Sequence, residues 1–93
     1  MKYDIFFPTP IERITDPTND NVDVCVTTAD GESYTLVCIT PDNLKSLMES
    51  NHEDFLSPSF KYIVVKRIDE STIRRALDEI VQDPSLLAFY GND

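Results

Sequence analysis

The sequence predicts an α+β fold: a small, mainly antiparallel sheet, formed by a hairpin over 22–39 and a strand over 61–67, with helices packed on one face. Three observations predict this class. Two runs of alternating apolar and polar residues flank an Asp-Gly pair, a third such run follows later, and two stretches repeat apolar residues at helical spacing. The chain has 93 residues, and we expect a single domain over 1–93 that buries about 64% of its unfolded surface.

The pair Asp30-Gly31 predicts a tight turn between the first two strands. An Asp-Gly pair readily adopts the positive φ angles of a two-residue type I′ turn. Symmetric pairing about such a turn places Val24 opposite Val37 and Thr27 opposite Tyr34. The core face of the hairpin would then carry Val22, Val24, Val26, Thr35, Val37 and Ile39. The second face would carry Asp23, Cys25, Thr27, Tyr34, Leu36 and Cys38.

The two cysteines would be diagonal neighbours on that second face, with Cα atoms roughly 7 Å apart. A disulfide is conceivable at this distance. Two cysteines are too few for a scaffold built on disulfides, and a cytoplasmic protein keeps its thiols reduced. We therefore expect Cys25 and Cys38 to be reduced structural residues.

Two helices are predicted from caps and apolar stripes. Thr40-Pro41 is a suitable N-cap and first turn for a helix that ends near Asn51. A second helix, capped by Asp69 or Ser71, is expected over about 70–83 and is followed by one helical turn over 84–90. The apolar stripes are Leu44, Leu47 and Met48 in the first helix, and Ile73, Ala76, Leu77, Ile80 and Val81 in the second.

Two further segments, the strand 61–67 and residues 1–21, decide what lies on the second face of the sheet and whether it is covered. In the strand 61–67, Ile63 and Val65 point to one side, and Tyr62, Val64 and Lys66 to the other. Residues 1–21 begin with a short alternating strand, Tyr3, Ile5 and Phe7, and prolines at 8, 10 and 17 prevent a longer one. The second face either is covered by this segment, which we expect, or serves as a partner surface.

The net charge of −9 and the pI near 4.3 restrict the partners. Nucleic acids and anionic membrane surfaces bind through Lys and Arg, so both are disfavoured. Residues 1–60 hold three basic and eleven acidic residues, net −8, whereas residues 61–93 hold five and six, net −1. No apolar run approaches the ~18 residues of a membrane span. We expect no signal peptide at the N-terminus, and the expected location is the cytoplasm.

No motif supports catalysis or metal binding. The run Asn19–Asp23 alternates oxygen side chains like a calcium loop, but Val24 stands where such a loop needs glycine, so a polar turn is expected. His52 is a lone histidine with no second strong metal ligand nearby. Neither cysteine is close to it in sequence, and two glycines cannot form a glycine-rich phosphate loop. We expect no enzyme, no cofactor and no metal.

The stretch from Val22 to Val81 resembles small bacterial immunity proteins of polymorphic and contact-dependent toxin systems. The resemblance lies in the hairpin around Asp30-Gly31, the helix start at Thr40-Pro41 with Leu47-Met48, the strand 60–65 and the capped last helix. It implies a protein without catalytic activity that binds and blocks its cognate toxin in the cytoplasm. It implies no particular binding residues, because such interfaces diverge with their toxins.

The resulting hypothesis is a stoichiometric immunity protein against a basic toxin, with a nuclease as the expected target, and a monomer when free. The candidate partner-binding residues are the rim acids Asp16, Asp20, Asp23, Asp30 and Glu32 and the anchors Tyr34 and Tyr62, surrounded by Thr27, Leu36 and Val64. A regulatory or scaffold module that binds a protein without inhibiting it is the alternative. An acidic nucleic-acid mimic is less favoured, because the acids show no regular rows.

Overall fold

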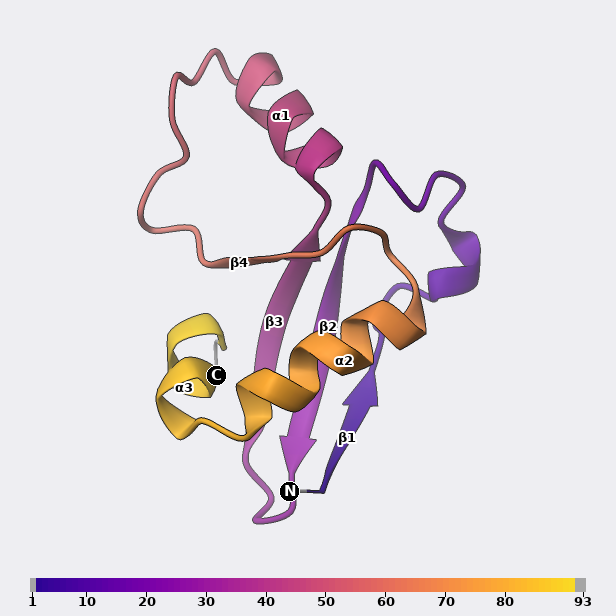
Figure 1. The fold of residues 1–93 in the computed structure, drawn as a ribbon, viewed down its shortest axis with the longest axis vertical. Coiled ribbons are helices and arrows are strands. Elements are labelled where there is room, and N and C mark those ends of the chain that lie inside the picture. Colours follow the sequence, from indigo (N-terminus) through magenta and orange to yellow (C-terminus); the bar gives the residue numbers. More distant parts are fainter. Residues whose placement is uncertain (1, 92–93) are drawn as a thin grey trace.

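The computed structural model describes residues 2–91 and confirms the α+β class. The sheet has the strand order β1-β2-β3-β4; β1, β2 and β3 are antiparallel, and β4 runs parallel to β3. Two helices cover one face of this sheet, and a third projects beyond its end (Figure 1). The elements are β1 (Tyr3–Phe6), η1 (Ile11–Arg13), β2 (Asn21–Thr28), β3 (Ser33–Ile39), α1 (Pro41–Ser50), β4 (Tyr62–Val64), α2 (Glu70–Val81) and α3 (Pro84–Tyr90).

The turn of the hairpin has three residues, so the predicted two-residue turn is wrong. The backbone N–H of Gly31 donates to the carbonyl of Thr28 at 3.0 Å, as in a type I turn. Gly31 follows with φ of 89°, and the N–H of Thr28 donates to the carbonyl of Glu32 at 2.9 Å. A type I turn followed by a glycine in the left-handed region is the usual three-residue hairpin connection.

The extra turn residue shifts the register by one and exchanges the two faces of β3. Val24 lies opposite Leu36 and Thr27 opposite Ser33, instead of Val37 and Tyr34. Because side chains alternate along a strand, a shift of one residue turns every side chain of β3 to the other face. The core face therefore holds Tyr34, Leu36 and Cys38, and the opposite face, here named the outer face, holds Thr35, Val37 and Ile39.

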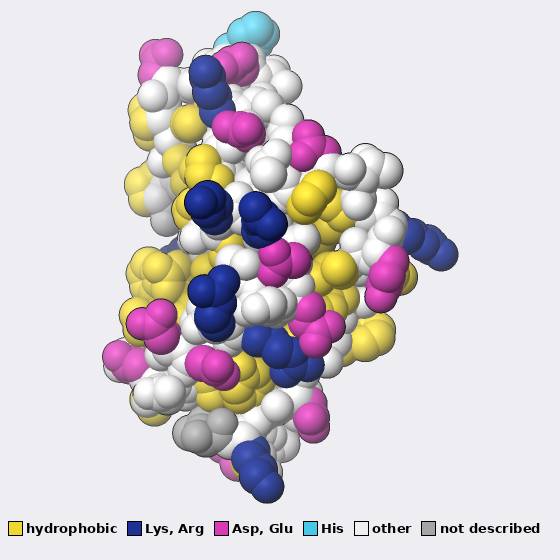
Figure 2. All heavy atoms as spheres, turned by 45° about the vertical axis from the view of Figure 1, so that its right-hand side comes forward, with side chains coloured by type: hydrophobic (Ala, Val, Ile, Leu, Met, Phe, Trp, Pro, Cys, Tyr) yellow, Lys and Arg dark blue, Asp and Glu magenta, His cyan; other side chains and the backbone are white. Residues whose placement is uncertain are grey.

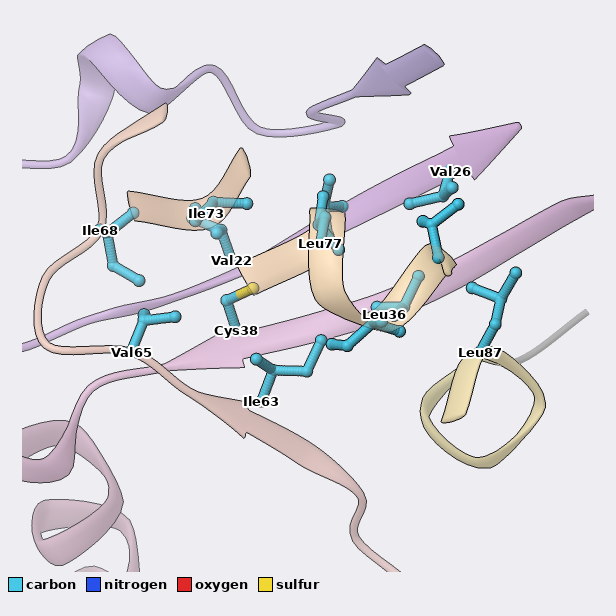
Figure 3. Packing of buried hydrophobic residues seen from close by; sticks show 13 residues of the cluster. Val22, Val26, Leu36, Cys38, Ile63, Val65, Ile68, Ile73, Leu77 and Leu87 are labelled. Carbon is cyan, nitrogen blue, oxygen red and sulfur yellow. The ribbon is translucent and has the colours of Figure 1, made fainter. Parts of the chain in front are cut away.

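The hydrophobic core lies between the sheet and α2, with α3 at its side (Figure 3). The side chain of Asp69 caps α2 by accepting a hydrogen bond from the backbone N–H of Thr72 at 2.7 Å. The predicted stripe of this helix is confirmed: its residues Ile73, Leu77, Ile80 and Val81 are buried. They meet buried side chains from β2, β3, β4 and α3, among them Val24, Leu36, Ile63 and Leu87.

The N-terminal segment forms an edge strand and does not cover the second face, so the covering interpretation is wrong. β1 pairs with β2 at the edge of the sheet and turns Tyr3 and Ile5 toward the core. The phenol of Tyr3 donates to Asp78 Oδ1 of α2 at 2.5 Å. Burial and this hydrogen bond raise the pKa of Tyr3 to about 12, so the phenol stays protonated and ties β1 to α2 at neutral pH.

The helix α1 has the predicted start but packs differently from α2. The hydroxyl of Thr40 accepts from the backbone N–H of Asn43 at 3.4 Å, and Asn51 is the C-cap. No residue of α1 is buried. The side-chain amide of Asn21, on the outer face, donates a hydrogen bond to the side-chain oxygen of Asn43 in α1 at 2.6 Å. The start of α1 therefore lies beside the outer face, at the end of the sheet where β3 ends. The expectation that the helices pack on one face is correct for α2 and α3 only.

The register places the two cysteines on opposite faces, which corrects the predicted diagonal pair. Cys38 is fully buried in the core, whereas Cys25 is half-buried on the outer face, and both are free. Burial raises the pKa of the Cys38 thiol to about 12. Because the thiolate is the reactive form, iodoacetamide should label Cys25 but not Cys38 in the folded protein. Peptide mass spectrometry checks this; equal labelling of both thiols would contradict the register.

Candidate protein-binding face

The outer face is the side of the sheet turned away from α2 and α3. Alternation along the paired strands assigns twelve positions to it. These positions are Asp4, Phe6, Asn21, Asp23, Cys25, Thr27, Ser33, Thr35, Val37, Ile39, Tyr62 and Val64. Ile39 is fully buried at the end where α1 begins, and the rest of the face is exposed or half-buried.

Large apolar side chains stand exposed at both edges of the outer face. Phe6 on β1 is 65% exposed and Val64 on β4 is 56% exposed. Phe60, just before β4, is 49% exposed and stacks on Tyr62, with ring centroids 5.6 Å apart and planes inclined by 6°. Val37 lies half-buried between these edges. A sheet face with this much uncovered apolar surface is typical of a protein-binding site.

The charge on the outer face is of one sign. Its twelve positions include the carboxylates of Asp4 and Asp23 and no Lys or Arg. Several cations lie on the helical side instead: Lys66, Arg67 and Arg75 line one hollow near the start of α2. Figure 2 shows part of that side, where basic and acidic side chains are intermixed. The ammonium of Lys61 also points there, 5.4 Å from the ring centre of Phe89 on α3.

The structure places two of the predicted site residues on the outer face, namely Asp23 and Tyr62. Tyr34 lies on the core face, because the register shift turns it away from Tyr62. Its half-buried ring packs against the core and against Gly91, where an added Cβ would lie 2.8 Å from Tyr34 Cδ1. The predicted pairing of the two tyrosines as anchors of one face is therefore wrong. Leu36, predicted to surround them, is buried in the core.

The other four predicted acids do not gather into one cluster. Asp16 and Asp20 precede β2, whereas Asp30 lies in the turn at its other end and Glu32 follows that turn. An eight-residue strand spans about 26 Å, so the two pairs mark opposite ends of the sheet. Asp16 accepts from the N–H and hydroxyl of Thr18, and Asp20 accepts from the N–H of Asn21 at 2.7 Å. These two carboxylates stabilise the connection that leads into β2.

Two prominent exposed rings, Phe6 on the outer face and Phe60 at its edge, are missing from the predicted site residues. The signal for Phe6 was present, because alternation of Tyr3 and Ile5 toward one side places Asp4 and Phe6 on the other. Phe60 lies outside the strand, and only its stacking on Tyr62 brings it to the edge of the face.

The arrangement is suited to binding a protein surface. Exposed apolar side chains at both edges, with carboxylates between and beside them, can bury apolar side chains of a partner and pair with its basic groups. Among residues 2–91, no group of three His, Cys, Asp or Glu side chains is placed to hold a metal ion. Over the same residues, no helix is both long and apolar enough to cross a bilayer.

Comparison with known proteins produced no match, whether to a family model, to a curated protein or to a solved structure.

Proposed function

We propose that this protein is a stoichiometric inhibitor of the immunity type, which binds a basic toxin, in the first instance a nuclease, through its outer face. The observation that carries the proposal is the uncovered outer face itself, with exposed Phe6, Phe60 and Val64 beside Asp4 and Asp23. Such a protein acts by occupying a surface of its target, so it requires a docking face and no catalytic groups of its own.

The outer face can form the centre of such an interface. The four strands hold 22 residues, each about 3.3 Å long, and lie about 4.8 Å apart, which gives a face of about 350 Å². A stable protein complex buries about 800 Å² on each partner, including a polar rim. The outer face and the loops around it can supply that area.

The charge of the face favours a basic partner over a second copy of the chain. Two outer faces pressed together would bring two copies of Asp4 and Asp23 close, without a Lys or Arg on either face to pair with them. Like charges placed opposite each other oppose association. A nuclease must carry Lys and Arg in its groove to hold phosphate, and an inhibitor that occupies this groove needs the opposite charge.

The first experiment is co-expression of this chain with the product of the adjacent open reading frame, followed by association kinetics of the purified complex across a salt series. Between about 0.01 M and about 1 M salt, the Debye length falls from about 30 Å to about 3 Å. We expect the association rate constant to fall at least about tenfold over this range, with a smaller change in the dissociation rate.

A matched pair of variants separates the outer face from the overall charge. Asp4→Asn with Asp23→Asn removes both carboxylates of the face, whereas Glu12→Gln with Glu79→Gln removes two exposed carboxylates elsewhere. The first pair should slow association more than the second. Failure to form a complex with the neighbouring gene product, or an association rate that does not respond to salt, would overturn the proposal.

A further inference from the structure

A small cavity lies between the tip of the hairpin and α3, outside the outer face. Its volume is about 240 Å³, and its lining includes Ala29, Asp30, Tyr34, Val81, Pro84 and Leu87. The β2–β3 turn, the start of β3, the last residue of α2 and the helix α3 contribute to it. Two of its residues, Asp30 and Tyr34, are predicted partner-binding residues that the outer face does not use.

The size and lining of the cavity suit one long side chain of a partner. Cavities that bind small molecules usually have volumes of about 300–1,000 Å³, which is larger than this one. Its walls are apolar along Val81, Pro84 and Leu87, and Tyr34 adds an aromatic ring. Such walls stabilise the apolar stem of a side chain, and an aromatic ring also favours a planar cation.

A single carboxylate sets the charge at the cavity. Asp30 Oδ1 accepts hydrogen bonds from the hydroxyl of Thr28 and from the backbone N–H of Glu32, the latter at 3.3 Å. These bonds fix the carboxylate in the turn. Both lower the pKa of Asp30, and the bond from Thr28 has the larger effect. No Lys or Arg is among the described residues that line the cavity. A cation that enters it therefore meets one ionised acid in the lining.

We propose that this cavity binds one arginine side chain of the basic partner, with its stem against Pro84 and its guanidinium near Asp30 and Tyr34. The partner's identity as a basic protein rests on the proposed function, whereas the cavity and its charge do not. Arginine fits better than lysine, because its planar guanidinium can both stack on an aromatic ring and donate two parallel hydrogen bonds to a carboxylate. The partner would reach this cavity around the hairpin tip, at the end of the sheet opposite α1.

The test uses the free protein and small probes, so it does not depend on finding the partner. The ¹⁵N-labelled chain is titrated with acetyl-arginine amide and, separately, with acetyl-citrulline amide, which has the same shape but no charge. Backbone amide shifts of Ala29, Val81 and Leu87 report binding. We expect the arginine probe to shift these amides with a dissociation constant on the order of millimolar. The citrulline probe should bind about three- to fivefold more weakly.

Two variants assign this preference to Asp30. Asp30→Asn keeps an oxygen that can accept the turn hydrogen bonds and should remove the difference between the two probes. Asp23→Asn, an acid on the outer face, should leave the difference unchanged. Equal binding of both probes to the wild-type chain, or no shift at the three amides, would overturn the inference. Either result would leave the proposed function standing, because the partner could still bind the outer face.

Discussion

Replacing Leu36 by alanine should lower the free energy of unfolding by about 2–5 kcal/mol, because it removes a fully buried side chain and leaves a cavity. Leu36 faces Val24 across the hairpin and packs in the core beneath α2. Its neighbour Val37 is half-buried on the outer face, so Val37→Ala should cost less than about 1 kcal/mol. Chemical denaturation of both variants measures the difference.

The same pair of variants tests the register of the hairpin. A two-residue turn at Asp30-Gly31 would place Val37 in the core and Leu36 outside it, and the order of the two effects would be reversed. If Leu36→Ala does not fold, Leu36→Val removes less volume and should still destabilise more than Val37→Ala does. A larger effect at Val37 than at Leu36 would contradict the three-residue turn.

Most of the helical part of the fold was predictable because its signals are local. α2 carries its N-cap and its whole apolar stripe within a short stretch of sequence. The structure places the stripe as predicted and selects Asp69 as the N-cap from the two candidates, Asp69 and Ser71. Thr40 and Pro41 likewise mark the start of α1. The packing of α1 was not predictable, because a half-buried stripe of three apolar residues has the same spacing as a buried one.

The register was not predictable from the pattern alone. Gly31 can supply a positive φ in either a two-residue or a three-residue turn. Both phases of β3 are apolar, since Leu36 and Cys38 alternate with Val37 and Ile39. The hydrophobic pattern therefore fits either face, and only packing against α2 and α3 decides between them. The same shift of one residue explains why Tyr34 was placed beside Tyr62 and why the cysteines were placed together.

The position of the N-terminal segment also depends on contacts with residues that are distant in sequence. Alternation at Tyr3 and Ile5 indicates a strand but does not say whether it pairs at an edge or lies over a face. Pairing of β1 with β2 leaves the outer face open, and this exposes Phe6 and Val64. The prediction placed Asp23 and Tyr62 on this face correctly, because their placement depends only on which residues of β2 and β4 alternate toward the core.

Under the proposed function, removing two aromatic rings of the outer face should abolish most of the affinity for the proposed basic partner. Phe6→Ala combined with Tyr62→Ala should weaken the complex at least about 30-fold, which corresponds to about 2 kcal/mol. The fold should persist, because Phe6 is 65% exposed and neither ring belongs to the buried core. The matched control is Phe89→Ala, which truncates an aromatic ring that is 53% exposed on α3, away from the outer face.

The most direct measurement is the dissociation constant of the co-purified neighbouring gene product, determined by calorimetry for the wild type, the Phe6→Ala/Tyr62→Ala variant and the Phe89→Ala control. The melting temperature of each variant is recorded beside it, so that loss of binding is not confused with unfolding. Binding through the outer face predicts the loss for the double variant alone, with the control within about twofold of wild type. A folded double variant that binds as tightly as the wild type would contradict it.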